Sequence, residues 1–428
     1  MEVKNILRNP SIWIAITFAT FTPLAPKPFN FILAVTAPVP PLLSYTFTQL
    51  RKKGIATVID EDLLYLITHM YGVSTGRPPH ERLFRLGWIS GKGYGVYTNI
   101  LNRISNLAKR WGYGFVVAIR IQAKEIRNMV FRDFMNRLSE AINVGEDLET
   151  FLQMEHETLM INYEADYARV LEAIKLLLGI YTAAMSSTVF ININMALLAL
   201  FFGNIQVLIV SFIGTLAALA SLVVLIKKSL PKQDIVHSLK INIGDRRLYL
   251  YSLLISTCTA SIVGSYMYLK LGEPSYFLII FGFFLFIPGL MGRRIEDKVK
   301  NVENFFTIFI RSLGLTYMTL RSYEQSIRSI LRSELGELTK HLRKLYSRLR
   351  NGVDTKVAML YFVGETGSET IRRGMDIFID SIEAGGDPAK VGQIISITIQ
   401  RLLNLRKQRE QVARAFQGIV YVLNILTV

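Results

Sequence analysis

The feature that most constrains this chain is a block of 51 residues, from Leu176 to Ile226, that contains no charged side chain. An α-helix rises about 1.5 Å per residue, and about 20 apolar residues cross the hydrocarbon core of a bilayer. The block is therefore long enough for two crossings, and residues 176–226 are predicted to form a transmembrane pair. An ordinary soluble globule is disfavoured, because its apolar residues would lie in short periodic stripes. The sequence predicts an integral membrane protein.

Two shorter apolar runs precede this block within residues 1–50 and are interrupted by several prolines. We interpret them as an N-terminal transmembrane hairpin, although prolines kink or end helices. The alternative is a secretory signal, since Lys4 and Arg8 come before the first apolar run. A clear small-residue cleavage site is missing from the sequence, and further spans follow, so the hairpin is the preferred interpretation.

Residues 248–292 contain a second transmembrane pair, predicted at Leu248–Leu271 and Tyr276–Met291. Residues 415–428 begin a final crossing that is expected to be incomplete within this sequence. Basic residues stand beside the crossings, for example Arg293 and Arg294 after the second pair, and such residues mark the cytoplasmic side. The sequence thus predicts a multi-pass protein of the cell membrane.

Three polar regions are consequently placed in the cytoplasm: residues 51–175, a basic linker at 227–247, and residues 293–414. Their net charges are 17 − 15 = +2, 6 − 2 = +4 and 22 − 14 = +8. Acidic lipid headgroups, or an acidic partner surface, would be attracted to this excess of positive charge. For the linker and the clusters at span ends, the positive-inside bias is a sufficient explanation.

Both large polar regions show helical periodicity, with little alternation of the kind that strands show. About six short helices are expected between Glu296 and Arg414, which is enough for a compact helical bundle. Helix boundaries are also legible, because glycine ends helices in the left-handed conformation and aspartate or serine caps the next one. The predicted boundary residues are Asn351, Gly352 and Asp354, then Gly367 and Ser368, then Gly385, Asp387 and Pro388.

The two bundles also resemble each other at a constant offset of 240 residues, which predicts a duplicated unit of bundle and transmembrane pair. In each copy an amphipathic helix ends at glycine and a new helix starts after aspartate. The matching residues are Arg132, Phe134, Leu138, Ile142, Gly145, Asp147 and Leu148, and Arg372, Gly374, Phe378, Ile382, Gly385, Asp387 and Pro388.

Chemistry-bearing motifs are scarce. The chain has one cysteine and five scattered histidines, so no metal site is predicted. The segment Gly87–Gly93 resembles a phosphate-binding loop, but it has three residues between its first two glycines and lacks Ser or Thr after Lys92, so it is interpreted as a flexible turn. Carboxylates such as Glu365 and Glu369 suit helix starts or solvated faces. We predict no catalytic residue and no cofactor.

The crossings likewise lack a buried Asp, Glu, Arg or His, which argues against an ion-coupled transporter. Nucleic-acid binding is disfavoured too, because the basic cluster from Arg401 to Arg414 has no interleaved aromatic residues. Membrane lipids or a protein partner are the preferred ligands of that cluster.

The ordered set of motifs resembles the type II secretion F-domain family, and within it the archaeal branch of archaellum and type IV pilus platform proteins. The resemblance extends from about Ile59 to the end. Members usually continue through a further pair of spans. The residues that carry it are Thr68–Met70, Ser74–Gly76, Tyr94 and Gly95, Trp111–Gly114, Phe134–Asp147, Phe151, Leu152, Glu155, Tyr163, Glu164, Tyr167, Asn351–Asp354, Val357, Ala358, Phe362–Ser368, Arg372–Gly374 and Ile382–Asp387.

This resemblance implies an all-α polytopic membrane protein, with two cytoplasmic helical bundles each linked to transmembrane helices. It implies a non-enzymatic platform, a homo-oligomer such as a dimer or trimer, whose bundles dock into a hexameric secretion ATPase and help pilin or archaellin subunits join a filament. We expect the docking surface among charges of the second bundle that we take to be exposed: Arg372, Arg373, Arg401, Arg406, Lys407 and Arg409.

Two other classes of function are compatible with such a chain. A transporter or channel regulated by its cytoplasmic helical domains is the main alternative, because a pore lined by hydroxyls and carbonyls needs no buried charge. An enzyme acting on lipids is disfavoured, since no catalytic groups cluster near the cytoplasmic membrane face.

Overall fold

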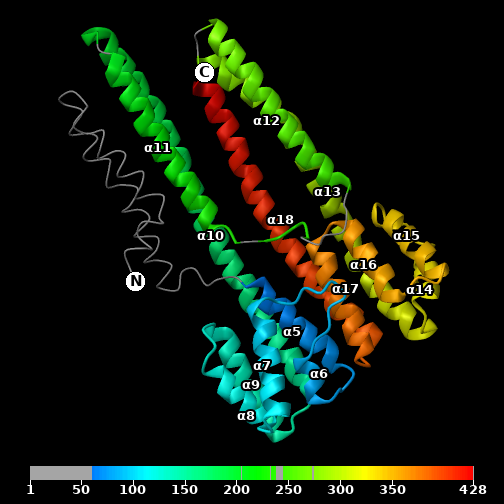
Figure 1. The fold of residues 1–428 in the computed structure, drawn as a ribbon. Coiled ribbons are helices and arrows are strands. Elements are labelled where there is room, and N and C mark those ends of the chain that lie inside the picture. The colour runs from blue at the N-terminus through cyan, green and yellow to red at the C-terminus, as the bar shows by residue number, and fades with distance from the viewer. Residues whose placement is uncertain (1–59, 204, 232, 238–243, 272–273, 428) are drawn as a thin grey trace. The chain divides into compact units, whose positions relative to one another are not determined.

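A computed structural model of the chain describes residues 60–203, 205–231, 233–237, 244–271 and 274–427. In these residues every regular element is an α-helix, and an isolated antiparallel bridge joins Val236 to Ser368. The chain is an all-α polytopic membrane protein, as the sequence predicts (Figure 1). The predicted N-terminal hairpin at residues 1–50 lies outside the described residues.

The described residues form two compact units. Unit 1 contains residues from Ile161 to Lys232 and from Asn404 onward, and unit 2 contains Asp60–Met160 and Gln233–Leu403. Both predicted bundle regions therefore contribute to unit 2, the first up to Met160 and the second up to Leu403.

Three helices in the described part of the chain are long and apolar enough to cross a membrane. Two of them, α10 (Leu148–Phe202) and α11 (Ile205–Ser229), contain the block from Leu176 to Ile226 and meet at Gly203, whose φ of 65° favours glycine. The third is α12 (Gly244–Leu271), with its apolar segment at Leu248–Tyr266. Helices long and apolar enough to cross a membrane are thus present at the predicted crossings, and the bounds 176–226 and Leu248–Leu271 stay predictions.

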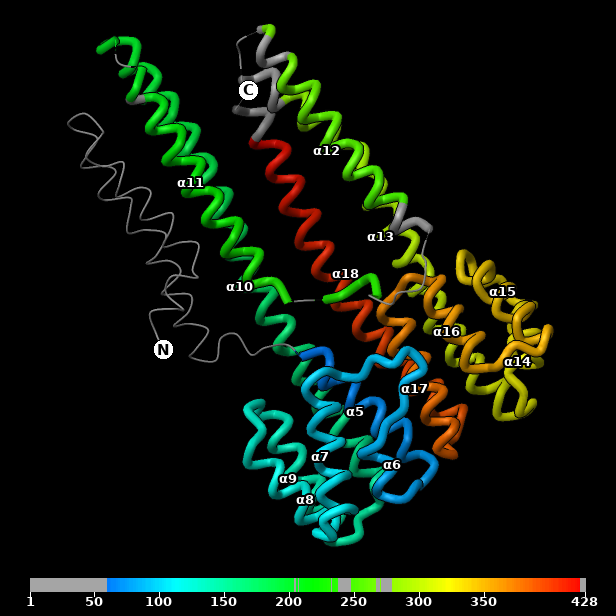
Figure 2. Tube along the Cα trace, in the orientation of Figure 1, coloured from blue at the N-terminus to red at the C-terminus, as the bar shows by residue number. Residues whose placement is uncertain are grey.

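Helix α13 (Pro274–Leu320) begins with the predicted crossing Tyr276–Met291, which stays a prediction. It lies antiparallel beside α12 (Figure 2), and Gly292 of α13 faces the ring of Tyr249. The crossing predicted at residues 415–428 falls on the end of α18 (Pro388–Thr427) and also stays a prediction.

The first part of unit 2 is a cluster of short helices around an aromatic core. The ring of Phe131 meets that of Tyr97 edge-on, with the ring centroids 4.7 Å apart. It also stacks on the ring of Phe134, with the centroids 6.3 Å apart, and both phenylalanines are buried. Such contacts give the region its own apolar core. Its helices are α5 (Glu61–Ser74), α6 (His80–Phe84), α7 (Val96–Arg110), α8 (Gly114–Ala123), α9 (Met129–Val144) and the first turns of α10.

The second part of unit 2 contains the remaining helices, built around Phe306, Phe309 and Phe362. Six helices occupy the span from Glu296 to Arg414, as predicted, but α13 and α18 are long helices rather than short ones. A change from apolar to charged residues does not end a helix when no stop signal accompanies it. The shorter helices are α14 (Tyr323–Ile330), α15 (Leu338–Arg350), α16 (Thr355–Thr366) and α17 (Glu369–Glu383).

The predicted helix boundaries are confirmed. Gly367 ends α16 with a φ of 74°, and Ser368 caps α17 by accepting a hydrogen bond from the Ile371 amide at 3.1 Å. Asn351 is the C-cap of α15, and Asp354 accepts from the Val357 amide at 3.1 Å at the start of α16.

The helix boundaries also repeat at the predicted offset of 240 residues. Gly145 and Gly385 both have a positive φ, of 76° and 87°. The amide after each glycine donates to the carbonyl five residues earlier, at 2.9 Å for Glu146 and 2.8 Å for Gly386. Helices α10 and α18 then start at Leu148 and Pro388, which differ by 240 residues. Two segments far apart in the chain thus use the same C-terminal stop.

Candidate functional site

The largest group of buried charges in the described residues lies on one face of α17. Glu369, Arg372, Arg373, Asp376 and Asp380 follow the three- and four-residue spacing that places side chains on one helical face. The opposite face carries buried apolar side chains, among them Ile371, Met375 and Phe378. The polar face is turned toward the first part of unit 2, with which it forms a joint that we call the α17 joint.

Asp376 is held by the turn that resembles a phosphate-binding loop. Its Oδ1 accepts from the amides of Ile89 and Ser90 at 3.0 and 3.2 Å, and its Oδ2 accepts from the Ser90 hydroxyl at 2.7 Å. Burial raises the pKa of Asp376, while the bonds from Ser90 and the charge of Arg372 act against that rise. The turn therefore binds an anion, and that anion is a carboxylate of the same chain.

Asp380 is held by His69 and Arg82 from the other side of the joint, and Tyr94 in turn contacts His69. Nε2 of His69 lies 2.9 Å from its Oδ2, Nδ1 of His69 lies 3.0 Å from the Tyr94 hydroxyl, and Arg82 pairs with its Oδ1. His69 is fully buried. Burial alone would raise the pKa of Asp380, but the hydrogen bonds from His69 and Arg82 outweigh it and lower that pKa. The carboxylate is thus fixed in its charged form.

Arg372 and Arg373 complete the joint. Arg372 donates to Glu369, to Asp376 at 2.8 Å, to the Ser90 hydroxyl at 2.8 Å and to the Lys92 carbonyl at 3.2 Å. Arg373 pairs with Asp62 of α5 at 2.7 Å and with Glu369 at 2.9 Å. The two guanidinium groups lower the pKa of Glu369, against the effect of its burial. Each charged side chain on this face of α17 therefore has a partner.

Glycines bring the backbones together at the same joint. A Cβ added to Gly76 would lie 2.6 Å from the carbonyl carbon of Gly385 and 2.7 Å from the amide of Gly386. The amide of Asp387 also donates to the Thr75 hydroxyl at 3.1 Å. Because backbone atoms cannot move aside as a flexible side chain does, only glycine fits at position 76.

A second contact within unit 2 joins the start of α10 to the start of α18. Glu149 pairs with Lys390 at 2.6 Å and Glu157 pairs with Arg401 at 2.9 Å. Between these pairs, Nε2 of His156 lies 3.1 Å from the Thr398 hydroxyl, and burial lowers the pKa of His156 to about 4. The imidazole is therefore neutral at neutral pH.

The linker after α11 contributes a third contact. His237 donates its amide to the Gly367 carbonyl at 3.0 Å, and Glu369 donates its amide to the Ile235 carbonyl at 3.1 Å. The buried ring of His237 lies 3.1 Å from the Gly364 carbonyl. Residues 233–237 are thus hydrogen-bonded to the start of α17. The basic character of the linker did not indicate this contact.

The expectation of exposed docking charges is wrong for part of the predicted set. Arg372 is 3% exposed and Arg406 is 7% exposed, and the side chain of Arg373 is 12% exposed. Arg401 is partly exposed and pairs with Glu157, Lys407 is exposed and Arg409 is partly exposed. Arg372 is buried because Glu369 and Asp376 lie three and four residues from it on the same helical face. Their carboxylates pair with its guanidinium group, and this spacing was visible in the sequence.

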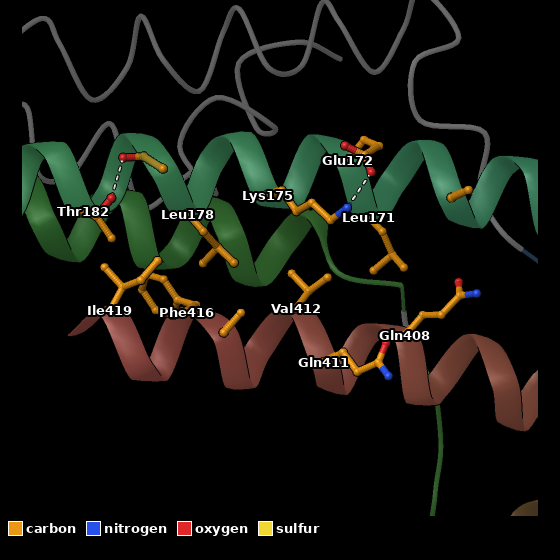
Figure 3. A pocket seen from close by; sticks show the side chains of 13 residues that line it. Leu171, Glu172, Lys175, Leu178, Thr182, Gln408, Gln411, Val412, Phe416 and Ile419 are labelled. Carbon is orange, nitrogen blue, oxygen red and sulfur yellow. Dashed lines mark hydrogen bonds and ion pairs between the residues drawn. The ribbon is translucent and has the colours of Figure 1, made fainter. Parts of the chain in front are cut away.

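A groove of about 540 Å³ lies in unit 1 between α10 and α18 (Figure 3). Its walls are mostly apolar, with Leu178 on one side and Phe416 on the other. Of the residues that line it, the two charged ones, Glu172 and Lys175, pair with each other at 2.6 Å. The groove is a gap between helices without converging reactive groups in its lining.

Comparison with known proteins gives a family match and two relatives. A family model for the type II secretion system protein F matches residues 309–428. Flagella accessory protein J of Methanocaldococcus jannaschii is 29% identical over 331 residues, which cover 74% of this chain and 58% of that protein. The protein of the same name from Methanococcus voltae is 27% identical over 398 residues, covering 89% and 70%.

This chain therefore spans less than two thirds of the length of the Methanocaldococcus jannaschii relative. No solved structure matches it.

Proposed function

This chain belongs to the type II secretion system F-domain family, in its archaeal branch, and from that membership we propose that it is the membrane platform of an archaellum or archaeal type IV pilus. In this proposal it catalyses no reaction. The platform passes movement of a cytoplasmic hexameric secretion ATPase to pilin or archaellin subunits in the membrane. Its oligomeric state would be a dimer or trimer.

The observation that carries the proposal is that α13 packs both on α12, a candidate membrane span, and on α17, the helix of the α17 joint. Helix α13 runs without interruption from the segment beside α12 to Leu320. Along the way Phe306 of α13 packs against Gly374 of α17, where an added Cβ would lie 2.8 Å from the ring. Movement imposed on the polar part of unit 2 would therefore reach α13 through packed contacts, since close-packed cores transmit strain.

The α17 joint supports a mechanical role over a chemical one. Its carboxylates and guanidinium groups are engaged with one another, whereas a catalytic carboxylate has to reach a substrate proton. Buried networks of paired charges hold a single arrangement of the parts that they join. This is the property that a force-transmitting body requires.

The cytoplasmic location proposed for the second helical bundle, residues 293–414, can be tested by labelling. The single cysteine, Cys258, is replaced by serine and Lys340, which is exposed, by cysteine. A membrane-impermeant maleimide should label Lys340→Cys in inverted vesicles and leave intact cells unlabelled. Labelling of intact cells would contradict the proposed topology.

Partner binding is tested by purifying the full chain in mild detergent and asking which proteins accompany it. Co-purification of a hexameric secretion ATPase and of a prepilin supports the proposal. Solute flux through proteoliposomes that contain only this chain would contradict it and favour a transporter.

A further inference from the structure

The α14–α15 hairpin, residues 321–350, is the most basic surface of the second part of unit 2. It contains eight basic and three acidic side chains, so its net charge is 8 − 3 = +5. The whole region 293–414 has a net charge of +8, from 22 basic and 14 acidic residues. Most of the positive excess of that region therefore lies in 30 of its residues.

The hairpin turns its apolar side inward and its cations outward. Ile327, Ile330, Leu338, Leu342 and Leu345 are buried. Seven of the eight basic side chains are exposed, which the amphipathic spacing of both helices explains. They are Arg321, Arg328, Arg332, Lys340, Arg343, Lys344 and Arg350.

These cations differ from the arginines of α17 in having few partners. Among the described residues, Lys344 and Arg348 of the hairpin reach a carboxylate, which is Glu365 of α16. The other six basic side chains make no ion pair or hydrogen bond with described residues. A cluster of unpaired like charges repels itself, and an acidic surface would relieve that repulsion.

The place of the hairpin along α13 argues against lipid headgroups as the source of that acidic surface. Gly292 lies beside Tyr249, at the start of the apolar segment of α12, and so marks the edge of the membrane-crossing part. The hairpin contacts α13 from Phe305, which faces Gly336, to Tyr317, which faces Tyr323. At about 1.5 Å per residue, Phe305 is about 20 Å along the helix from Gly292.

That separation decides between the two anionic partners. Electrostatic attraction decays over a screening length of about 8 Å at physiological salt. Headgroups at the level of Gly292 would therefore act only weakly on the hairpin. A protein in the aqueous phase has no such restriction.

We propose that the outward face of the α14–α15 hairpin is the docking surface for an acidic face of the cytoplasmic ATPase assembly. This inference rests on the proposed function and adds the surface through which the partner is held. It replaces Arg372 and Arg373 as contact residues. Those two side chains instead fix α17 to the first part of unit 2.

The test compares two triple charge reversals in the full-length chain. The hairpin variant is Arg328→Glu, Arg332→Glu and Arg343→Glu. The matched control is Arg110→Glu, Arg120→Glu and Arg127→Glu, three exposed cations of the first part of unit 2 that make no ion pair with described residues. Both variants change the net charge equally, so a difference between them reports the location of the charge.

Binding of the purified hexameric ATPase from the same organism is measured with detergent-solubilised chain at low and high salt. The hairpin variant should bind about tenfold or more weakly at low salt, and the control within about twofold of wild type, because charge complementarity is local. The difference should shrink at high salt. Replacing the same three hairpin residues by alanine should weaken binding in the same direction without adding negative charge.

The outcomes distinguish a failure of the proposed function from a failure of the docking surface alone. If the wild-type chain does not bind the ATPase, the proposed function fails and the docking surface fails with it. If wild type binds and the hairpin variants bind equally well, the docking surface alone is wrong. Loss of binding to anionic vesicles or to an RNA oligonucleotide, with ATPase binding retained, would also overturn it.

Discussion

Replacing Arg372 by methionine tests whether the α17 joint holds unit 2 together. The guanidinium is 3% exposed and contacts Glu369 and Asp376, whose side chains are 11% and 4% exposed. Removing one partner of a buried ion pair costs about 3–5 kcal/mol, because the remaining charge is left uncompensated. Arg373 still pairs with Glu369 and Ser90 still binds Asp376, so we expect a loss of about 3 kcal/mol, at the lower end of that range.

The matched control is Arg401→Met, which breaks a partly exposed pair with Glu157. That pair should contribute about 0–1 kcal/mol. Thermal unfolding of the detergent-solubilised full chain gives the comparison, and limited proteolysis near Ser90 reports opening of the turn. Equal unfolding midpoints for Arg372→Met and Arg401→Met would refute a buried network.

The defect of Arg372→Met should also depend on pH. Burial raises the pKa of Asp376, and losing Arg372 removes a charge that opposes this rise. A group whose pKa is higher in the folded than in the unfolded state stabilises the fold in acid and loses that contribution as pH rises. The penalty of Arg372→Met should therefore be smaller near pH 5 than near pH 8. A penalty that is constant over this range would contradict the assignment.

Three further predictions concern the same unit. Gly76→Ala should destabilise unit 2 by about 1–3 kcal/mol through overpacking against Gly385, whereas Gly179→Ala, which meets no atom within 4 Å, should leave the unfolding midpoint unchanged or raise it. His156→Gln should reduce the acid sensitivity of unfolding. The pKa of His156 is about 4 in the folded protein, so on acidification the unfolded state binds the proton first. The free energy of unfolding of the wild type should therefore fall by about 2 kcal/mol between neutral pH and pH 5 because of this residue. Equal acid sensitivity in both proteins would contradict this. Ser90→Ala removes hydroxyl bonds to Asp376 and Arg372 and should cost about 1–3 kcal/mol, with faster cleavage of its turn by protease as the readout.

Much of the fold could be predicted from local signals. The crossings between Leu176 and Ile226 follow from the absence of charge, and the repeated helix stops follow from Gly145 and Gly385. These features depend on hydropathy and on backbone preference, both of which are properties of short segments.

The candidate site could be predicted only in part. Glu369, Arg372 and Asp376 have the spacing of paired charges on a helix, so their mutual contacts were available from the sequence. Ser90 lies about 280 residues before Arg372, and His69 lies about 310 residues before Asp380. No local sequence pattern predicts a contact over such a separation. For the same reason the sequence did not indicate that the turn at Gly87–Gly93 binds the carboxylate of Asp376.

The distance along the chain between the two halves of the α17 joint has a consequence for how the protein is made. The turn with Ser90 leaves the ribosome long before Asp376, and the candidate spans α10, α11 and α12, followed by the predicted crossing at the start of α13, are synthesised in between. His69 and Arg82 therefore meet their carboxylate only after these helices have entered the bilayer in the right order. We therefore expect the joint to close late in biogenesis, because a chain inserted with an odd number of these crossings would leave Asp380 on the opposite side of the membrane from His69.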